Sequence, residues 1–377
     1  MMEAMANTPI FLSRPYLDEE DIQAVVDVLR SGNLVQGDKV LKLEQNINDL
    51  TGSKFSSAVS NGTASLHLAL LALGIGQGDE VIVPAFSYIA TGNAVELTGA
   101  KPVFVDVHLE TFNIDESKLE AAITSHTKCI MPVHEFGLCA NMEVIMAIAA
   151  KHKLFVVEDA ACAIGASHYG KFAGTFGDFG SFSLHPRKSV TSGEGGILTT
   201  QNPALDRKIK TLRNHGIAPD RIPMEFVAAG FNYRLTDFQA ALVSSQMRRL
   251  QQIFQHKNEL VELYNQGLKQ NGIVLPSVPD GNVHSWQTFH ILCKDEYFRN
   301  SLIDHLKSHQ IFTNYGAQCI PAMTYYKEKY KYDVAKLFPN SFKAYTCGLA
   351  LPMSERLTKE EVQAVINRIN QFTNDQK

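Results

Sequence analysis

Short apolar runs alternate with helical segments over the first half of the chain. We predict strands at the apolar runs 56–60, 81–83, 103–105, 129–133 and 154–157. We predict helices at the intervening segments 64–73, 90–97, 116–123 and 142–152. The strands are too short and too uniformly apolar to leave one face in solvent. This alternation predicts an α/β fold with a mainly parallel central sheet and helices on both of its faces.

The pattern changes near residue 250. The elements that we predict outside the alternating region are helices at 18–31 and around 40–50, a mostly helical connection at 235–268, a strand at 290–292, and helices at 300–308 and 359–374. A chain of 377 residues is long enough for a large domain and a smaller one. We therefore expect a large domain over residues 1–250, including an N-terminal segment, and a small C-terminal α+β domain over 251–377.

Composition excludes several classes of protein. Hydrophobic residues make up 45% and charged residues 20% of the chain, which is ordinary for a soluble globular protein. The net charge is -4 and there is no basic block, so we expect no nucleic-acid partner. No stretch reaches the roughly 18 apolar residues of a membrane span, and the first residues lack a signal-peptide pattern. The six cysteines form no C-x-x-C pair, which is typical of reduced thiols, and we expect a cytoplasmic protein.

Residues 180–196 read GSFSLHPRKSVTSGEGG and place Lys188 between a hydroxyl-rich apolar run and a glycine-rich turn. A protonated lysine is a poor nucleophile, but a partly desolvated pocket near other cations lowers its pKa and allows a Schiff base to form. His185 and Arg187 would add positive charge nearby. Pyridoxal phosphate (PLP) requires such a lysine and a carboxylate for its pyridine nitrogen. Taken alone, Lys188 is better explained as a solvated loop lysine, so the cofactor role depends on the residues around it.

The candidate carboxylate is Asp159, which follows the apolar run 154–157. Ligands in parallel sheets lie beyond the carboxyl ends of the strands, where an acid can hold the pyridine nitrogen protonated. A helix cap or a surface acid is the alternative explanation. We favour the cofactor role, and Asp159 over Glu158, because Lys188 follows after a further predicted strand at 180–184.

The turn 61–63, Asn-Gly-Thr, joins a predicted strand to a predicted helix. Free N–H groups at a helix N-terminus and a threonine hydroxyl suit a phosphate, although an ordinary capped turn explains the same residues. Ser183, shortly before Lys188, could bind the same phosphate. Tyr88 follows the strand 81–83 and could stack on a planar ring, but core packing explains an aromatic residue there as well.

Two further patterns have ordinary structural explanations. His305 and His309 have the i, i+4 spacing of a metal-binding pair, but no third ligand is close in the sequence, so we expect no metal. The segment 314–319 could line a substrate pocket, and structural packing explains it equally well.

Six stretches agree in order and spacing with one known family. They are SNGTASLHLAL (60–70), GDEVIVPAFSYIAT (78–91), GAKPVFVDV (99–107), VEDAACAIGA (157–166), FGDFGSFSLHPRKSVTSGEGG (176–196) and GFNYRLTDFQAAL (230–242). In these stretches the chain resembles the DegT/DnrJ/EryC1/StrS family of PLP-dependent sugar aminotransferases. The resemblance runs from about residue 11 to the last predicted helix. It implies the fold-type I aminotransferase architecture and a homodimer with active sites at the subunit interface.

The resemblance also implies roles for single residues. The implied cofactor contacts are Gly62, Thr63, Ala64, Tyr88, Asp159, Cys162, Ser183, Lys188 and Asn232. Lys188 would bind PLP covalently and move the proton, and Asp159 would pair with the pyridine nitrogen. Thr63, Ala64 and Ser183 would hold the phosphate, Tyr88 would stack on the ring, and Asn232 would reach the phosphate in the neighbouring subunit. Cys162 stands where many members have a glutamine, and a thiol donates only weakly near the phenolic oxygen.

The chemistry implied by the resemblance is transamination through pyridoxamine phosphate (PMP). L-Glutamate would supply the amino group, and a nucleotide-linked 4-keto-6-deoxy sugar would receive it. The product would be an amino sugar for a surface polysaccharide, such as the lipopolysaccharide O-antigen, or for a glycosylated metabolite. A 3-keto-6-deoxy sugar is the alternative acceptor. Related sugar dehydratases carry histidine in place of the lysine, and a non-catalytic regulatory relative should lack Lys188 or Asp159. Both residues are present, so we rank these two alternatives lower.

Overall fold

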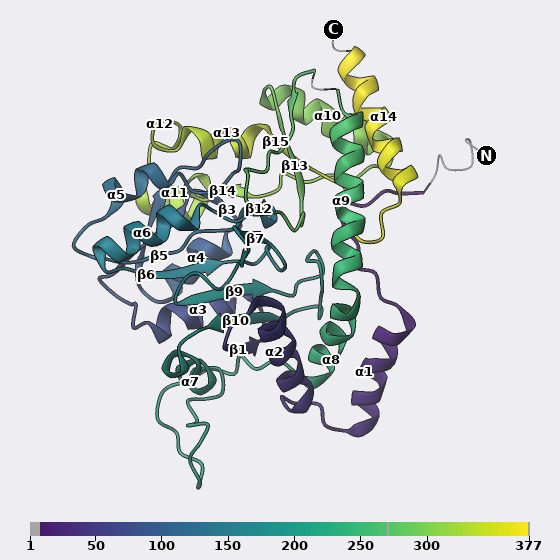
Figure 1. Ribbon diagram of the computed structural model, residues 1–377. Coiled ribbons are helices and arrows are strands. Elements are labelled where there is room, and N and C mark those ends of the chain that lie inside the picture. The colour runs from purple at the N-terminus through teal and green to yellow at the C-terminus, as the bar shows by residue number, and fades with distance from the viewer. Residues whose placement is uncertain (1–7, 270, 376–377) are drawn as a thin grey trace.

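A seven-stranded sheet forms the centre of the protein, whose computed structural model describes residues 8–269 and 271–375 (Figure 1). Its strands, in spatial order, are β1 (Phe55–Val59), β10 (Gly196–Thr200), β9 (Phe179–Ser183), β6 (Phe155–Asp159), β5 (Thr127–Ile130), β2 (Glu80–Pro84) and β4 (Lys101–Val105). From β9 to β4 all neighbours pair in parallel, whereas β10 is antiparallel to both β1 and β9. The predicted mainly parallel α/β sheet is confirmed.

Helices cover both faces of this sheet, as its buried strands require. The helices against one face are α3 (Gly62–Ala72), α4 (Ala90–Leu97) and α7 (Pro203–Leu212), and those against the other are α2 (Asp38–Thr51), α6 (Met142–His152) and α8 (Asp237–Gln246). Side chains of β2 show the alternation, because Val81 and Val83 pack with α3 whereas Ile82 packs with α6.

Two strands differ from the predicted ones. The run expected at 129–133 pairs as a ladder only up to Ile130, and beyond it an isolated bridge joins Val133 to Asp159. Strand β10 was not predicted, because its run begins with a glycine and ends in two threonines. Its strand conformation depends on the partners β1 and β9, which lie on either side of it.

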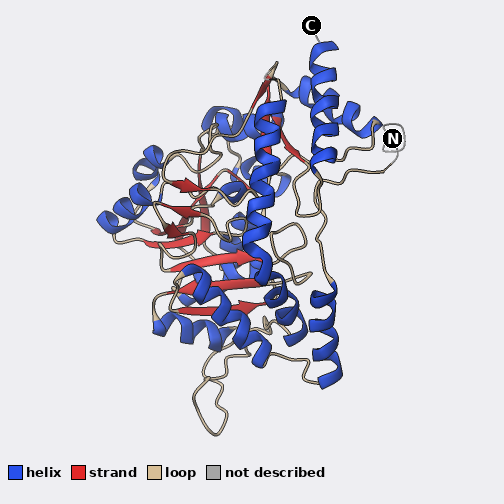
Figure 2. Ribbon diagram, turned by 45° about the vertical axis from the view of Figure 1, so that its right-hand side comes forward, coloured by secondary structure: helices blue, strands red, loops and turns tan. Residues whose placement is uncertain are grey.

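A second, antiparallel sheet lies near the C-terminal helix (Figure 2). It consists of β11 (Ile273–Val274), β13 (Phe289–Cys293) and β15 (Gly348–Leu351), and it packs with α9 (Leu250–Gly267), α10 (Glu296–Ser308) and α14 (Lys359–Asp375) in one hydrophobic cluster. The predicted strand 290–292 and the two predicted helices lie within β13, α10 and α14.

Each of the two main sheets packs with a segment from the other part of the chain. Ile10, near the N-terminus, belongs to the hydrophobic cluster of the smaller sheet and bridges Ile311. In the opposite direction, β14 (Gln318–Cys319) pairs with β3 (Phe86–Ser87), and Tyr326 lies in the core of the large sheet. The division at residue 250 stays a prediction.

The remaining elements are short or peripheral. They are α1 (Glu19–Ser31), α5 (Leu119–Ala122), α11 (Thr324–Tyr330), α12 (Val334–Leu337), α13 (Pro339–Cys347), a small sheet of β12 (Asn282–Val283), β7 (Ser167–His168) and β8 (Lys171–Phe172), and 3₁₀ turns at Glu116–Lys118, Glu135–Gly137, Met247–Arg249 and Ile320–Ala322. Within the described ranges, no helix is long and apolar enough to cross a membrane.

Candidate active site

A cavity of about 650 Å³ lies at the carboxyl edge of the parallel strands. It is lined by the large sheet and by the C-terminal part of the chain that is built on the second sheet, which we call the small region. This volume is in the range of small-molecule sites. The predicted cofactor contacts that line it are Gly62, Thr63, Ala64, Tyr88, Asp159, Cys162, Ser183 and Lys188. Asn232 does not line it. The structure thus gathers every predicted contact except one, from strands and turns far apart in the sequence.

Lys188 lies in the turn that follows β9, and its side chain is half-buried. Its Nζ donates a hydrogen bond to Cys162 Sγ at 3.0 Å. The explanation of Lys188 as a solvated loop lysine is therefore wrong. Burial raises the pKa of the Cys162 thiol, so this partner remains neutral beside the amine.

Asp159 ends β6, and its side chain is 4% exposed. One carboxylate oxygen accepts a hydrogen bond from Thr91 Oγ1 at 2.7 Å, and the other accepts one from the Ala161 N–H at 3.2 Å. Burial raises the pKa of Asp159, against the opposing effects of these hydrogen bonds and of the Lys188 charge. The explanation as a surface acid is wrong. A buried carboxylate that forms no ion pair with any described residue suits a ligand that brings a positive charge, as a protonated pyridine nitrogen does.

Glu158, the neighbouring acid, faces the opposite side of the sheet. Its carboxylate accepts hydrogen bonds from the backbone N–H groups of Gly174, Phe176 and Gly177 at 2.7–2.8 Å. His134 Nε2 lies 2.9 Å from it, and the Ala140 N–H donates to His134 Nδ1, which assigns the proton to Nε2. Strand alternation therefore places one acid in the cavity and the other in a structural network.

The N-terminus of α3 borders the cavity beside the end of β9. Asn61 caps this helix, because its Oδ1 accepts a hydrogen bond from the Ala64 N–H at 2.7 Å. The capped-turn explanation is thus confirmed, and the phosphate role stays a prediction; the first-turn N–H groups of Gly62 and Thr63 have no partner within the helix. A Cβ at Gly62 would lie 3.0 Å from the Ser183 Cβ, so glycine allows the two segments to approach. The helix terminus and the Ser183 hydroxyl form a cradle that suits a phosphate.

The positions of Tyr88 and of the segment 314–319 bear on two alternatives that the sequence leaves open. Tyr88 is 64% exposed at the margin of the cavity, so core packing does not explain it. Within the segment 314–319, Gly316 and Ala317 line the cavity, whereas Cys319 is buried in β14. Burial lowers the pKa of His185, so Arg187 and not His185 brings positive charge to this wall.

Several lining residues were not predicted, namely Ser87, Thr91, Glu135, Tyr233 and Gln287. Thr91 and Glu135 carry the same signal as Thr63 and Asp159, a hydroxyl at a helix start and an acid just after a strand. Gln287 carries no such signal. It reaches the site from the small region, where its amide donates to the Arg187 carbonyl at 3.0 Å.

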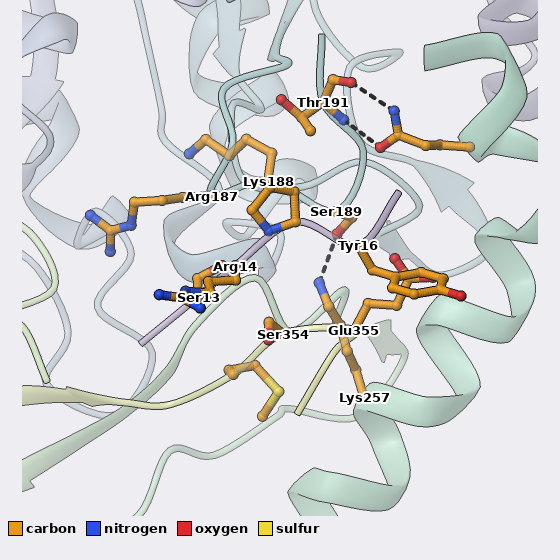
Figure 3. Close-up of a pocket in the computed structure, with 13 residues that line it drawn as sticks. Ser13, Arg14, Tyr16, Arg187, Lys188, Ser189, Thr191, Lys257, Ser354 and Glu355 are labelled. Carbon is orange, nitrogen blue, oxygen red and sulfur yellow. Dashed lines mark hydrogen bonds between the residues drawn. The ribbon is translucent and has the colours of Figure 1, made fainter. Parts of the chain in front are cut away.

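A small cavity of about 20 Å³ lies behind Lys188 (Figure 3). Lys257 of α9 is buried there, and its Nζ donates to Ser189 Oγ at 2.9 Å. Gln246 of α8 forms two hydrogen bonds with the backbone of Thr191, at 3.0 and 2.7 Å. In Figure 3 the Lys188 side chain points away from Lys257. The two helices thus fix the turn from behind and leave the lysine amine to the main cavity.

Comparison with known proteins gives matches along nearly the whole chain. Residues 15–370 match the model of the DegT/DnrJ/EryC1/StrS aminotransferase family. The chain is 36% identical to the spore coat polysaccharide biosynthesis protein SpsC of Bacillus subtilis, over 95% of both chains. It is also 36% identical to the UDP-4-amino-4-deoxy-L-arabinose–oxoglutarate aminotransferase of Shewanella sediminis, over 98% of this chain and 99% of the other. Among solved structures, Spr1654 of Streptococcus pneumoniae in its PMP form has a TM-score of 0.93 and 29% identity, covering 98% of both chains, and a PLP form has a TM-score of 0.92.

Proposed function

Because the chain belongs to the DegT/DnrJ/EryC1/StrS aminotransferase family, we propose that it transfers an amino group from L-glutamate to a nucleotide-linked 4-keto-6-deoxy sugar. Family membership confirms the enzyme class expected from the sequence, a PLP-dependent sugar transaminase, and its cofactor. The expected fold-type I aminotransferase architecture is confirmed by the similarity to the PLP and PMP forms of Spr1654. The amino donor, the sugar and the roles of single residues belong to the proposal.

The observation that carries the proposal is the meeting of Lys188, Asp159 and the cradle at Gly62 in one cavity. These residues fit PLP, because the buried Asp159 carboxylate needs a positive partner and the helix terminus needs an anion. When bound, PLP supplies a ring that accepts the electron pair left after a proton leaves the carbon next to the amino nitrogen.

Side chains and backbone groups of the protein would each act on a defined part of the cofactor. Asp159 keeps the ring nitrogen protonated, and the α3 terminus, Thr63 and Ser183 hold the phosphate. Lys188 Nζ would move the proton between the substrate carbon that bears the amino nitrogen and the C4′ atom of the cofactor. Its partner Cys162 is a neutral thiol, because burial raises the pKa of this group, so Lys188 has no ion pair with this neighbour.

The wall formed by Arg187 supports a nucleotide sugar as the acceptor. The Nε atom of Arg187 is buried and forms no hydrogen bond with any described residue, although the side chain lines the cavity. A guanidinium that lines a cavity and has an unused N–H donor suits the diphosphate of a nucleotide sugar. The name of the Shewanella relative places its amine at C4 of a UDP-linked sugar and pairs the enzyme with oxoglutarate, which supports C4 and glutamate here. The polysaccharide role in the name of SpsC supports a surface polysaccharide as the destination.

Exposed apolar side chains support a homodimer as part of the proposal. They gather on the loop that projects below α7 in Figure 1, where Ile222 is fully exposed and Met224 and Phe226 are each 65% exposed. Apolar groups that project together in this way are typical of a surface that a partner covers. Asn232 follows this loop, outside the cavity of its own chain, where its backbone bridges Asn214. We place it at the phosphate in a second copy, and we place the dimer in the cytoplasm.

A half-reaction spectrum tests the proposal. The protein is loaded with PLP, converted to its pyridoxamine form with L-glutamate, freed of excess donor and mixed with nucleotide ketosugars one at a time. We expect the visible band of the lysine-bound cofactor to return with a 4-keto-6-deoxy sugar. Return with a 3-keto sugar alone would move the reaction to C3. A spectrum that glutamate never changes would contradict glutamate as the donor.

The variant Lys188→Ala is the control for this experiment. It should bind PLP without the covalent band and show no transamination, because no other group at the site replaces its amine. The exposed Lys54→Ala should behave as the wild type. Turnover of Lys188→Ala at the wild-type rate would remove the assignment of this residue.

A further inference from the structure

Glu135 is a second buried acid of the cavity, and one of its oxygens is unpaired. The residue is 4% exposed and lines the same cavity as Asp159 and Lys188. Its Oε2 atom is buried and accepts no hydrogen bond from any described residue. The backbone is fixed, because the Glu135 N–H donates to Asn113 Oδ1 at 2.9 Å within the 3₁₀ turn after β5. The residue is therefore fixed at the cavity, and one of its carboxyl oxygens has no hydrogen-bond partner among the described residues.

The environment keeps this carboxyl in its acid form. Burial, and after it the negative charge of Asp159, raise the pKa of Glu135 to about 8, against the opposing effects of the Lys188 charge and of hydrogen bonds with the Phe136 backbone and the Ser87 side chain. At neutral pH the group is thus mainly a carboxylic acid, which has one O–H donor. With the proton on Oε2, which has no partner among the described residues, the O–H is a buried donor without an acceptor. Such a donor destabilises a protein, so in a binding cavity it indicates an acceptor on the ligand.

The chemistry of PLP leaves one acceptor that needs a partner. Under the proposed function, Asp159 binds the ring nitrogen, Lys188 binds the aldehyde carbon, and the cradle at Gly62 binds the phosphate. The atom left is the phenolic oxygen, which is bonded to the ring carbon next to the one that carries the aldehyde. Cys162 lies beside Lys188, but a thiol is a weak donor and its sulfur already accepts the Lys188 hydrogen bond.

We propose that Glu135 is a cofactor-binding residue whose carboxylic acid donates a hydrogen bond to the phenolic oxygen of PLP and PMP. This inference deepens the proposed function. It rests on the binding of the cofactor and does not depend on which sugar or donor the enzyme uses. The acid would do what a thiol at position 162 does poorly, and it would hold the ring between Asp159 and Lys188.

The test compares three proteins for binding of PMP, which has no covalent bond to Lys188. We expect Glu135→Leu, which removes the donor, to bind PMP about 10-fold more weakly, the loss expected for one hydrogen bond. Its PLP form should also show a shifted absorption maximum, because the phenolic oxygen belongs to the chromophore. Glu135→Gln keeps an N–H donor without a charge and should remain within about threefold of the wild type.

Each outcome has a separate meaning. Equal PMP affinity and an unchanged spectrum in Glu135→Leu would overturn the inference while leaving the aminotransferase proposal intact. Equal losses in the leucine and glutamine variants would also overturn it, because the ionised carboxylate would then be the active form. A wild type that binds no cofactor would contradict the proposed function itself.

An infrared measurement on the wild type covers the case in which the leucine variant does not fold. A protonated carboxyl has a C=O stretch, which Glu135→Gln should remove and thereby assign. We expect this band to shift when PLP is added to the apoprotein. A band that is absent, or that PLP leaves in place, would contradict the inference.

Discussion

Asp159 and Glu158 are adjacent in the chain but have different surroundings. Asp159 accepts hydrogen bonds from Thr91 and from the Ala161 N–H inside the cavity. Glu158, on the other face of β6, accepts hydrogen bonds from three backbone N–H groups and contacts His134. Because side chains of a strand alternate between faces, one acid is available to a ligand and the other holds the loop 174–177. The two residues should therefore respond differently to loss of charge.

We predict that Asp159→Asn lowers kcat by on the order of 100-fold with little change in stability, because the ring nitrogen loses the charge that keeps it protonated. Glu158→Gln should instead lower the free energy of unfolding by about 2–3 kcal/mol, because its carboxylate accepts several charge-assisted hydrogen bonds. Steady-state kinetics and urea denaturation of both variants check this. The reverse pattern, with activity lost in Glu158→Gln and stability lost in Asp159→Asn, would exchange the two roles.

At the scale of elements, α9 supports the turn that carries Lys188. Lys257 of this helix is buried against Ser189, and desolvation lowers its pKa from 10.5 to about 8. Between these two values the unfolded chain binds a proton that the folded chain does not. The contribution of Lys257 to the free energy of unfolding therefore rises as the pH rises from about 8 to 10.5. Below pH 8 the buried ammonium lowers the free energy of unfolding.

We predict that Lys257→Met removes this pH dependence. The difference in free energy of unfolding between the variant and the wild type should change by about 3 kcal/mol, in favour of the wild type, as pH rises from 8 to 10.5. Urea denaturation of the apoproteins at several pH values measures it, since the other lysines titrate alike in both. Lys54→Met, at an exposed lysine, should give no such change. A flat difference for Lys257→Met would mean that this amine titrates normally.

At the scale of the whole molecule, one chain gives an incomplete site by our proposal. Asn232 lies outside its own cavity, and the loop with Ile222, Met224 and Phe226 projects from the fold. A second copy that covers this loop would bring Asn232 to the other chain's phosphate.

We predict that Phe226→Asp yields monomers, because a carboxylate would be buried in the interface. Asn232→Ala should remain dimeric but retain less cofactor after dialysis. Light scattering with size-exclusion chromatography gives the mass, and absorbance gives the cofactor content of each protomer. Tyr297→Asp, at a residue of α10 that is 79% exposed, is the matched control. A wild type that is monomeric, or an Asn232→Ala variant with full cofactor content, would contradict the shared site.

Local patterns in the sequence determined much of this protein. The alternation of apolar runs and helical segments predicts the order of the elements, because periodicity reports which side chains each element must bury. The positions of Lys188, Asp159 and Thr63 beyond strand ends predict a common edge, because parallel strands bring their carboxyl ends together. The family resemblance then supplied the cofactor and the activity, which local patterns alone left open.

Tertiary structure decided what depends on segments far apart in the chain. The strand β10 forms only because β1 and β9 flank it, and Gln287 and Lys257 reach the site only because the small region folds back over the large sheet. The acid form of Glu135 arises from burial beside Asp159, which lies on the neighbouring strand. Burial and charge at one point sum contributions from many segments, and no local window of sequence contains them all.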